Sequence, residues 1–172
     1  MIYRLFYPVV PVLVVAKHGS QVSGLTAIWY CPLSFNPPTI GVSLSPNHQT
    51  YKLLTRSRRF SLCWLDVKHS KSLDFVGRIS ASQVKNKIVA AGLSVIAGKE
   101  GRTPMVREAV AVLDCRLKKK IRFGTHDLLV GFVASAYSSR DFQEYWKYKS
   151  YHPAIYTGTD VKGRSVFRTL AE

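Results

Sequence analysis

Short apolar runs rich in β-branched residues recur along the chain, and turns rather than long helical repeats separate them. Such runs are typical of buried strands, and two-residue alternation is typical of half-buried ones. Pro37 and Pro38 end the second run, because a pair of prolines fits neither a sheet ladder nor a helix. The pattern predicts strands at residues 9–17, 22–35, 39–45, 59–67, 107–124 and 126–139, and a Gly-containing hairpin near the end of the chain.

Helical periodicity is limited to short stretches. Residues 47–56 place Tyr51, Leu53 and Leu54 on one face, which predicts a short amphipathic helix. The segment 69–104 has no long period, and its serines and glycines predict short helices joined by surface loops. Strands interrupted by two or three short helices favour a closed antiparallel barrel with helical insertions, and 172 residues fit one domain.

The composition is that of a globular and strongly basic protein. Hydrophobic residues make up 47% and charged residues 20%, and 25 Lys and Arg against 10 Asp and Glu give a formal net charge of +15. Such a charge attracts anions of several classes, namely nucleic acids, acidic lipids and phosphorylated small molecules. The net charge therefore indicates an anionic partner but does not show to which of these classes the partner belongs.

Cysteines and apolar runs give no sign of secretion or of a metal site. Cys31, Cys63 and Cys115 lie in apolar segments without CxxC or Cys/His spacing, so we expect three small buried side chains in a reducing cytosol. The apolar run 9–16 is shorter than the roughly 20 residues of a membrane span, and no cleavage site follows it. We therefore expect a cytoplasmic protein without membrane insertion.

No motif in the chain supplies catalytic chemistry by itself. Five histidines occur, yet GxSxG, HxxxH, HxxE and CxxC are all absent. The cysteines lie in hydrophobic runs, where burial raises the pKa of a thiol and lowers its reactivity. We therefore expect no metal site and no catalytic residue that a motif identifies, so that a cofactor from outside has to bring the chemistry.

The stretch "SLSPNHQT", residues 43–50, concentrates hydrogen-bonding side chains before the expected helix. If Pro46 begins that helix, Ser45 is its N-cap, and the amide groups of the first turn suit a phosphate dianion. Ser45, His48 and Thr50 can add side-chain donors. The alternative is an ordinary serine cap, which needs no ligand.

The segments around this stretch resemble the flavin reductase-like domain family, the FMN-binding split barrels. "YPVVPVLVVA" matches the opening strand of that family, and "GLTAIWYCPLSFNPP" matches its next motif. The matched positions in the second motif are Thr26, Trp29, Ser34, Pro37 and Pro38. An asparagine often precedes the threonine in the family, whereas this chain has Ser23-Gly24 there.

Further pieces follow in the order of the family. Ser45 and Thr50 match its polar turn before a helix, and "RFSLCWL" matches the strand after it. "SASQVKNKI" keeps only Ser80, Val84 and Lys87 of a later motif, while "EAVAVLDCRL" and "GTHDLLVGFV" resemble the late strand pair. The resemblance covers about residues 7 to 139. The departures in "SASQVKNKI" concern the rim of the pocket and hence the substrate.

The resemblance implies a mainly β fold, an antiparallel and Greek-key-like FMN-binding split β-barrel. A single domain would span residues 1–172, with 140–172 as a C-terminal extension that packs on the barrel or on a dimer partner. The residues that the resemblance places at the flavin ring are Thr26, Ala27, Ile28 and Trp29. Those that it places at the phosphate are Ser43, Ser45, His48 and Thr50, with Lys87 as a nearby cation.

Three of these assignments have an alternative. Trp29 could equally be a core aromatic residue, and Lys87 could be one of many solvated surface charges. His126 is a candidate catalytic residue that could face the pocket at its position in the family. A structural hydrogen-bonding role is the alternative. The catalytic residues are otherwise unknown.

The function implied by the resemblance is that of an NAD(P)H-dependent reductase of flavin, or of a ferric or other acceptor, which works by hydride transfer through bound FMN or FAD. The protein would be a homodimer with one flavin near each subunit interface. No GxGxxG occurs, so the nicotinamide would dock only transiently. The alternatives are a non-enzymatic basic barrel that binds nucleic acid, and a split barrel that holds flavin or haem without turnover.

Overall fold

The computed structural model describes residues 2–98 and 103–170. Its helices are the 3₁₀ helices η1 (Ile2–Phe6) and η2 (Val67–His69) and the α-helices α1 (Gln49–Ser57), α2 (Ser70–Arg78) and α3 (Lys87–Ala90). Its strands are β1 (Val12–His18), β2 (Gln21–Ala27), β3 (Tyr30–Ser34), β4 (Thr39–Leu44), β5 (Arg59–Leu65), β6 (Val95–Ala97), β7 (Pro104–Val106), β8 (Ala109–Phe123), β9 (His126–Ser138), β10 (Ile155–Thr159) and β11 (Ser165–Arg168).

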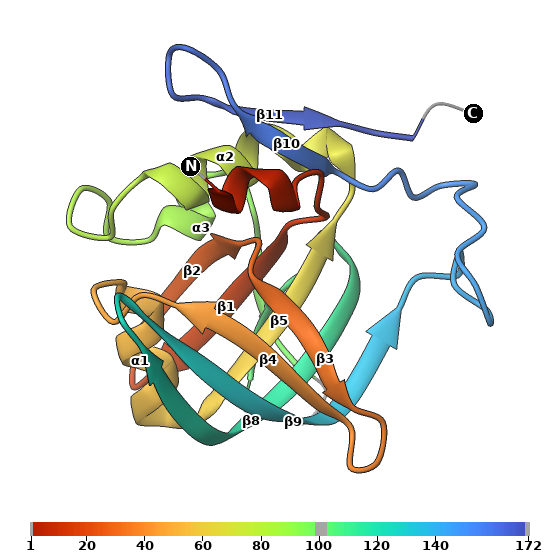
Figure 1. The fold of residues 1–172 in the computed structure, drawn as a ribbon. Coiled ribbons are helices and arrows are strands. Elements are labelled where there is room, and N and C mark those ends of the chain that lie inside the picture. The colour runs from red at the N-terminus through yellow and green to blue at the C-terminus, as the bar shows by residue number, and fades with distance from the viewer. Residues whose placement is uncertain (1, 99–102, 171–172) are drawn as a thin grey trace.

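Seven strands form one curved antiparallel sheet in the order β2-β1-β5-β8-β9-β4-β3. The amide of Ser43 in β4 donates to the carbonyl of Trp29, 2.8 Å away, at the connection between β2 and β3. This bond continues the β3–β4 ladder beyond the pair Tyr30 and Val42, and Figure 1 shows the strands curving around a common interior. The expectation of a mainly β, antiparallel barrel is confirmed.

Both faces of the sheet are covered by apolar side chains. One cluster fills the barrel interior and includes Leu54 of α1, Phe60 of β5 and Leu129 of β9. Gly131 allows the sheet to close over Phe60, because a Cβ atom at this position would lie 2.7 Å from Cζ of the phenyl ring. The second cluster, which includes Leu73 and Ile88, packs α2 and α3 against the outer face. The helices thereby fix the segment between them beside β2.

The predicted strand boundaries differ from the observed ones where a strand ends in the middle of an apolar run. The expected strand 22–35 is two strands, β2 and β3, separated at Ile28 and Trp29. Apolar patterning could not show this break, because the residues on either side of it are equally apolar. Segment 69–104 contains the β6–β7 hairpin in addition to short helices. Cys31 is exposed on β3, so the expectation of three buried cysteines is wrong for this one.

The described part of the C-terminal extension packs on the barrel of its own chain. The β10–β11 hairpin lies beside η1 and α2 (Figure 1). Val9 and Tyr156 form a β-bridge, and the amide of Ser165 donates to Oδ1 of Asp74 at 3.0 Å. The amide of His152 donates to Oδ2 of Asp66 at 2.8 Å. No helix among residues 2–98 and 103–170 is long and apolar enough to cross a membrane.

Candidate functional site

Two clefts adjoin each other between β2, the start of α1 and the end of α2. The larger one, the polar cleft, has a volume of about 1120 Å³, and the smaller one, the small cleft, has about 220 Å³. Leu25, His48 and Gly77 line both of them. A ligand could therefore extend from one cleft into the other.

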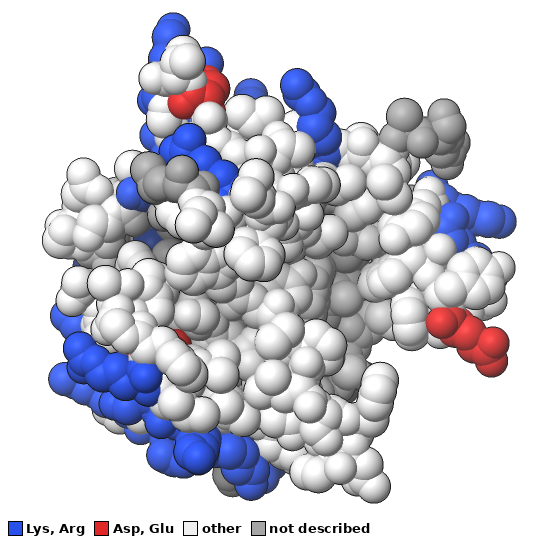
Figure 2. Space-filling view, in the orientation of Figure 1, with Lys and Arg blue, Asp and Glu red and all other residues white. Residues whose placement is uncertain are grey.

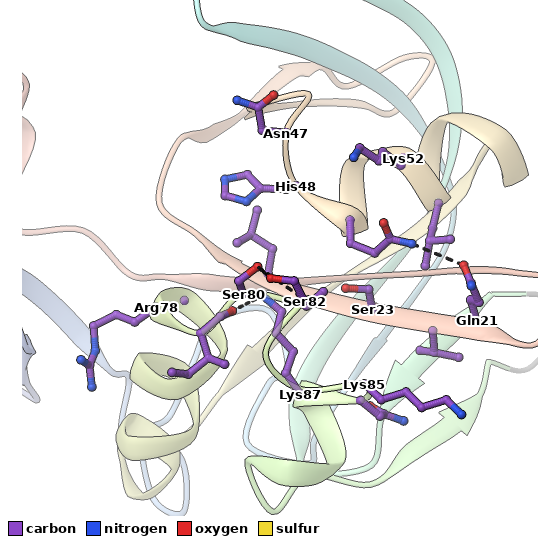
Figure 3. Close-up of a pocket in the computed structure, with 18 of the residues that line it drawn as sticks. Gln21, Ser23, Asn47, His48, Lys52, Arg78, Ser80, Ser82, Lys85 and Lys87 are labelled. Carbon is purple, nitrogen blue, oxygen red and sulfur yellow. Dashed lines mark hydrogen bonds between the residues drawn. The ribbon is translucent and has the colours of Figure 1, made fainter.

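The polar cleft carries cations and hydroxyl groups but no carboxylate among its described lining residues. Its cations are Lys52, Arg78, Lys85 and Lys87, and its hydroxyl groups are those of Ser20, Ser23, Ser80 and Ser82. Arg78 is paired with Asp74 through a 2.7 Å contact, and Figure 3 shows its side chain pointing away from the serines. The three lysines are left to attract an anion such as a phosphate group.

Lys87 is a buried residue at the beginning of α3, and only 6% of it is exposed. Its Nζ donates to the carbonyl oxygens of Val76 at 2.8 Å and Ile79 at 3.1 Å, at the C-terminal end of α2. Burial lowers its pKa to about 8. Figure 3 shows the side chain reaching toward Ser80 and Ser82. The alternative of a solvated surface charge is therefore wrong.

The small cleft brings together most of the residues that the resemblance assigns to the cofactor. Its described lining includes the predicted residues Thr26, Ala27, Ile28, Trp29, Ser43, Ser45, His48 and His126. Trp29 is 39% exposed, so the alternative of a core aromatic residue is wrong. Its ring lies 5.0 Å from the ring of His126, measured between centroids. Thr26 is fixed by its hydroxyl group, which donates to the carbonyl of Leu73 at 2.7 Å.

His48 stands where the two clefts meet. Burial lowers its pKa, and the positive charges of Lys87 and His126 lower it further. The imidazole is therefore neutral near pH 7 and can offer a hydrogen bond without a charge. Nδ1 of His126 is 2.9 Å from the hydroxyl oxygen of Thr125, so His126 has a structural hydrogen bond as well as a place in the cleft.

Helix α1 begins at Gln49, three residues after Pro46, so Ser45 is not its N-cap. The N-cap is His48, whose side chain makes no capping bond. Residues 45–48 instead form a turn, in which the amide of His48 donates to the carbonyl of Ser45 at 3.2 Å. Proline fits this turn as well as it fits a first helical position, which is why the pattern is ambiguous. The amides of the first turn of α1 begin at Gln49 and still face outward.

Thr50 is the predicted residue that lines neither cleft. Its side chain is buried, and its Oγ1 is 3.0 Å from Oγ of Ser23 on β2. That bond ties α1 to the strand that forms the wall of the polar cleft. A contact between the side chain of Thr50 and a phosphate stays a prediction.

Several lining residues were not predicted. Ser20, Gln21, Lys52 and Gly77 are contributed by three different segments. A further wall comes from the segment after α2, with Arg78, Ile79, Ser80, Ala81, Ser82, Lys85 and Asn86. The concentration of basic and serine residues in "RISASQVKNK" was the available signal for that wall. No pattern in the sequence predicted a role for Ser20, Gln21, Lys52 and Gly77, because these residues meet only when β2, α1 and α2 pack together.

Comparison with known proteins places the chain in a family. The family model described as "Flavin reductase like domain" matches residues 3–160. An uncharacterised protein of Aeropyrum pernix is 34% identical over 166 residues, which are 96% of this chain and 63% of that protein. The match therefore spans less than two thirds of this relative.

Two further relatives have names that state a function. A ferric-chelate reductase (NAD(P)H) of Archaeoglobus fulgidus is 26% identical over 140 residues, covering 81% of each chain. The crystal structure of an FMN-binding protein from Thermus thermophilus with bound p-hydroxybenzaldehyde has a TM-score of 0.82 and 28% identity, covering 99% of this chain and 93% of that one. From the match over residues 3–160 together with these likenesses, this chain belongs to the flavin reductase like domain family.

Proposed function

We propose that this chain is a flavoprotein that binds FMN across the two clefts and works as an NAD(P)H-dependent oxidoreductase. The observation that carries the proposal is the junction of a cleft rich in cations and hydroxyl groups with a cleft bounded by Trp29 and a strand end. FMN combines a phosphate, a hydroxylated chain and a flat ring, so its parts correspond to these two environments. The FMN-binding relative from Thermus thermophilus and the ferric-chelate reductase support the same reading.

The polar cleft would hold the phosphate and the hydroxylated chain. Lys87 and the outward-facing amides at the start of α1 stabilise a dianion, and the serines at 80 and 82 supply hydroxyl donors. Their mutual hydrogen bond of 2.9 Å shows that these two hydroxyl groups already lie together. His48 lies between this part and the ring and offers a neutral donor or acceptor.

The small cleft would hold the ring. Its lining includes Thr26, Ala27, Ile28 and Trp29 at the end of β2, together with Ser43 and Ser45 at the end of β4. Ser43 would thus meet the ring rather than the phosphate, because it shares this cleft with Trp29 and does not line the polar cleft. A bound flavin supplies two-electron redox chemistry that no side chain here provides. The side chains of Trp29 and His126 limit the access of water to the ring side.

The overall reaction that we propose oxidises NAD(P)H and reduces a second flavin, a ferric complex or another acceptor. NAD(P)H carries several phosphate charges, and a chain with a net charge of +15 attracts such an anion. The chain has no GxGxxG loop, so the nicotinamide would dock transiently at the open side of the clefts. FAD stays an alternative cofactor, since the polar cleft is large.

A visible absorption spectrum of the purified protein, taken before and after addition of FMN and then of NADH without oxygen, tests the proposal. We expect bound yellow flavin that bleaches with NADH. Yellow protein that does not bleach would point to a flavin or haem carrier without turnover, and a colourless protein with no affinity for FMN would overturn the proposal. Lys87→Met should weaken FMN binding, whereas Lys162→Met, a change in the exposed β10–β11 turn, is the matched control.

We also propose that the protein is a homodimer. Leu33, near the end of β3, is 46% exposed, and Phe35, in the turn between β3 and β4, is 98% exposed. Exposed apolar side chains that lie close together mark interaction sites. Light scattering during gel filtration would measure the molar mass. A mass near the 19.3 kDa of one chain at all concentrations would contradict the dimer. The cytoplasmic location stays a prediction.

A further inference from the structure

The end of the β8–β9 hairpin exposes a run of cations that the proposed cofactor site does not use. Residues 118–125, which we call the basic hairpin, include the exposed cations Lys118, Lys119, Lys120 and Arg122. None of these four residues lines the polar cleft or the small cleft. Their charge therefore needs an explanation other than the flavin.

Carboxylates do not balance these cations at the surface. Asp114 and Asp127 are the acidic residues of β8 and β9, and both are buried. Oδ2 of Asp127 lies 4.0 Å from Nζ of Lys120 and neutralises this lysine in part. Helix α1 adds the exposed Lys52 and Arg56, and Figure 2 shows basic side chains along the edge where α1 and the hairpin lie. A surface with one sign of charge fits an extended anionic surface better than a protein surface of mixed charge.

The turn of the basic hairpin adds an apolar side chain. Phe123 is the last residue of β8, follows Arg122 directly and is 62% exposed. Gly124, with a φ of 53°, and Thr125 then form the turn to β9. Segments that bind the surface of a membrane combine these two features, because the apolar side chain enters the headgroup region while the cations attract anionic lipids.

The neighbouring strands hold the hairpin in place before any partner binds. Lys120 is opposite Leu129 and Phe123 is opposite His126 in the β8–β9 ladder, while β9 also pairs with β4. Leu129 is buried in the barrel core. Binding would therefore order little additional chain, which lowers its entropic cost. Because His126 also lines the small cleft, docking at the turn would bring that cleft close to the lipid surface.

Nucleic acid is another extended anion, but the hairpin lacks the stacked aromatic residues that single strands use. Nζ of Lys118 lies 5.4 Å from the centre of the Phe132 ring, and Nζ of Lys120 lies 5.9 Å from that of the buried Tyr51. These lysines thus lie over the two rings, and Phe123 is the one aromatic residue of segment 118–125. A second copy of the chain would bring the same net charge of +15 and be repelled.

We propose that the basic hairpin docks the protein on the surface of a membrane that contains anionic lipids. Lys118, Lys119 and Arg122 contact the headgroups, and Phe123 enters the interface between headgroups and acyl chains. The contact is peripheral and reversible, because one aromatic side chain and a few cations contribute far less than a spanning segment. The inference goes beyond the proposed function and does not rest on it.

Sedimentation with lipid vesicles tests this docking. The full chain is mixed, at about 100 mM salt, with vesicles of phosphatidylcholine that contain about 30% phosphatidylglycerol, or with vesicles of phosphatidylcholine alone. We expect at least about tenfold tighter binding to the anionic vesicles. Lys118→Gln combined with Lys119→Gln should weaken that binding by at least about tenfold. Lys71→Gln combined with Lys162→Gln is the matched control, since it removes the same charge from exposed positions on α2 and in the β10–β11 turn.

The apolar contribution is tested at the turn. Phe123→Ser should weaken binding to the anionic vesicles by at least about threefold, and Phe123→Trp should retain it, since tryptophan favours the membrane interface. Val161→Ser is the control, because Val161 is a fully exposed apolar residue in the β10–β11 turn. Thermal melts of all variants should match that of the natural chain, because the altered side chains are exposed.

Equal binding to the two kinds of vesicle, or equal effects of the two lysine pairs, would overturn the inference. Tighter binding of single-stranded DNA than of anionic vesicles, compared per phosphate at the same salt, would overturn it in favour of nucleic acid. Titration with FMN keeps the two proposals apart. A chain that binds anionic vesicles but not FMN would support the docking and overturn the flavoprotein proposal, and the reverse result would overturn the docking alone.

Discussion

At the scale of single residues, Lys87 links the chemistry of the cleft to pH. Its ammonium group has exchanged water for two carbonyl oxygens, and burial lowers its pKa to about 8. A phosphate dianion nearby stabilises the charged form and so raises that pKa. Above pH 8, binding of FMN therefore requires the uptake of a proton.

We expect the affinity for FMN to fall by roughly tenfold between about pH 7 and about pH 9.5, where the free protein loses the charge of Lys87. Quenching of FMN fluorescence across this range measures it. Lys87→Met should bind more weakly at neutral pH and show a much flatter profile, while Lys162→Met should keep the profile of the natural chain. The same flat profile in the natural chain would contradict a role for the Lys87 charge.

Lys87 also predicts how the stability of the free protein depends on pH. Its folded pKa of about 8 is below the ordinary value of 10.5, so between these values the unfolded chain binds more protons than the folded one. Stability due to this residue therefore rises with pH across that window. Urea unfolding at several pH values, compared with Lys87→Met, should show the natural chain gaining on the variant from pH 8 upward; a constant difference would argue against the lowered pKa.

Ser45 and Thr50 belong to one polar stretch but should differ in what they contribute. Ser45 lines the small cleft, whereas the side chain of Thr50 is buried against Ser23. Ser45→Ala should reduce FMN affinity about threefold to tenfold and leave stability nearly unchanged. Thr50→Val should lower the free energy of unfolding by about 1–2 kcal/mol, because the hydroxyl group of Ser23 loses its partner. Parallel FMN titrations and thermal melts of the two variants measure these effects. A loss of FMN affinity without a loss of stability in Thr50→Val would show that Thr50 contacts the ligand.

At the scale of elements, the site depends on how closely α2 approaches β2. Gly77 of α2 lines both clefts, and a Cβ atom at this position would lie 3.4 Å from Cβ of Thr26, in ordinary contact. The helix can therefore accept alanine here. A longer side chain would have to enter the space where the two clefts meet.

Gly77→Ala should stabilise α2 by about 0.5–1 kcal/mol, since glycine loses more freedom than alanine in a helix. Gly77→Leu should also fold, but its FMN affinity should be lower by at least about tenfold. The leucine side chain would occupy the space that the ligand needs where the two clefts meet. Thermal melts and FMN titrations of both variants check this pair. Unchanged FMN affinity in Gly77→Leu would mean that the ligand does not pass this junction.

At the scale of the whole molecule, the distribution of charge separates the two classes of anion. Figure 2 shows basic side chains gathered along one edge of the visible face, where α1 and the β8–β9 hairpin lie in Figure 1. Lys118, Lys119 and Lys120 are exposed on β8. This patch lies on the surface, whereas Lys87 is buried in the cleft. A polyanion would use the patch, and a small phosphorylated ligand would use the cleft.

We therefore expect single-stranded DNA to bind weakly and to lose at least about a hundredfold in affinity between roughly 50 and 500 mM salt, because it releases counterions. FMN should lose less than about tenfold over the same range, since much of its contact is with neutral groups and a buried cation. Fluorescence anisotropy and FMN quenching measure the two affinities. DNA binding that is tight and insensitive to salt would favour the nucleic-acid alternative.

The sequence alone predicted the greater part of the fold. Alternation of apolar residues identified β8 and β9, and the proline pair located the end of the β3 region. The polar stretch 43–50 indicated the edge of a cleft. So many small polar side chains between a strand and a helix are not expected in an apolar core. These properties are local, because they depend on which side chains avoid water and on which backbones proline permits.

Tertiary structure alone decided the remaining points. Lys87 looks like any other lysine in the sequence, and it became a buried cation only because α3 packs its side chain against the end of α2. Trp29 is outside the core because the chain leaves the ladder between β2 and β3, where the carbonyl of Trp29 accepts from the amide of Ser43. A further cavity is lined by residues from segments far apart in the chain, namely Tyr3, Phe6, Tyr7, Val9, Ile28, Trp29, Tyr30 and Ser43. Patterning tells which residues leave water but not which ones they meet, since those contacts join segments far apart in the chain.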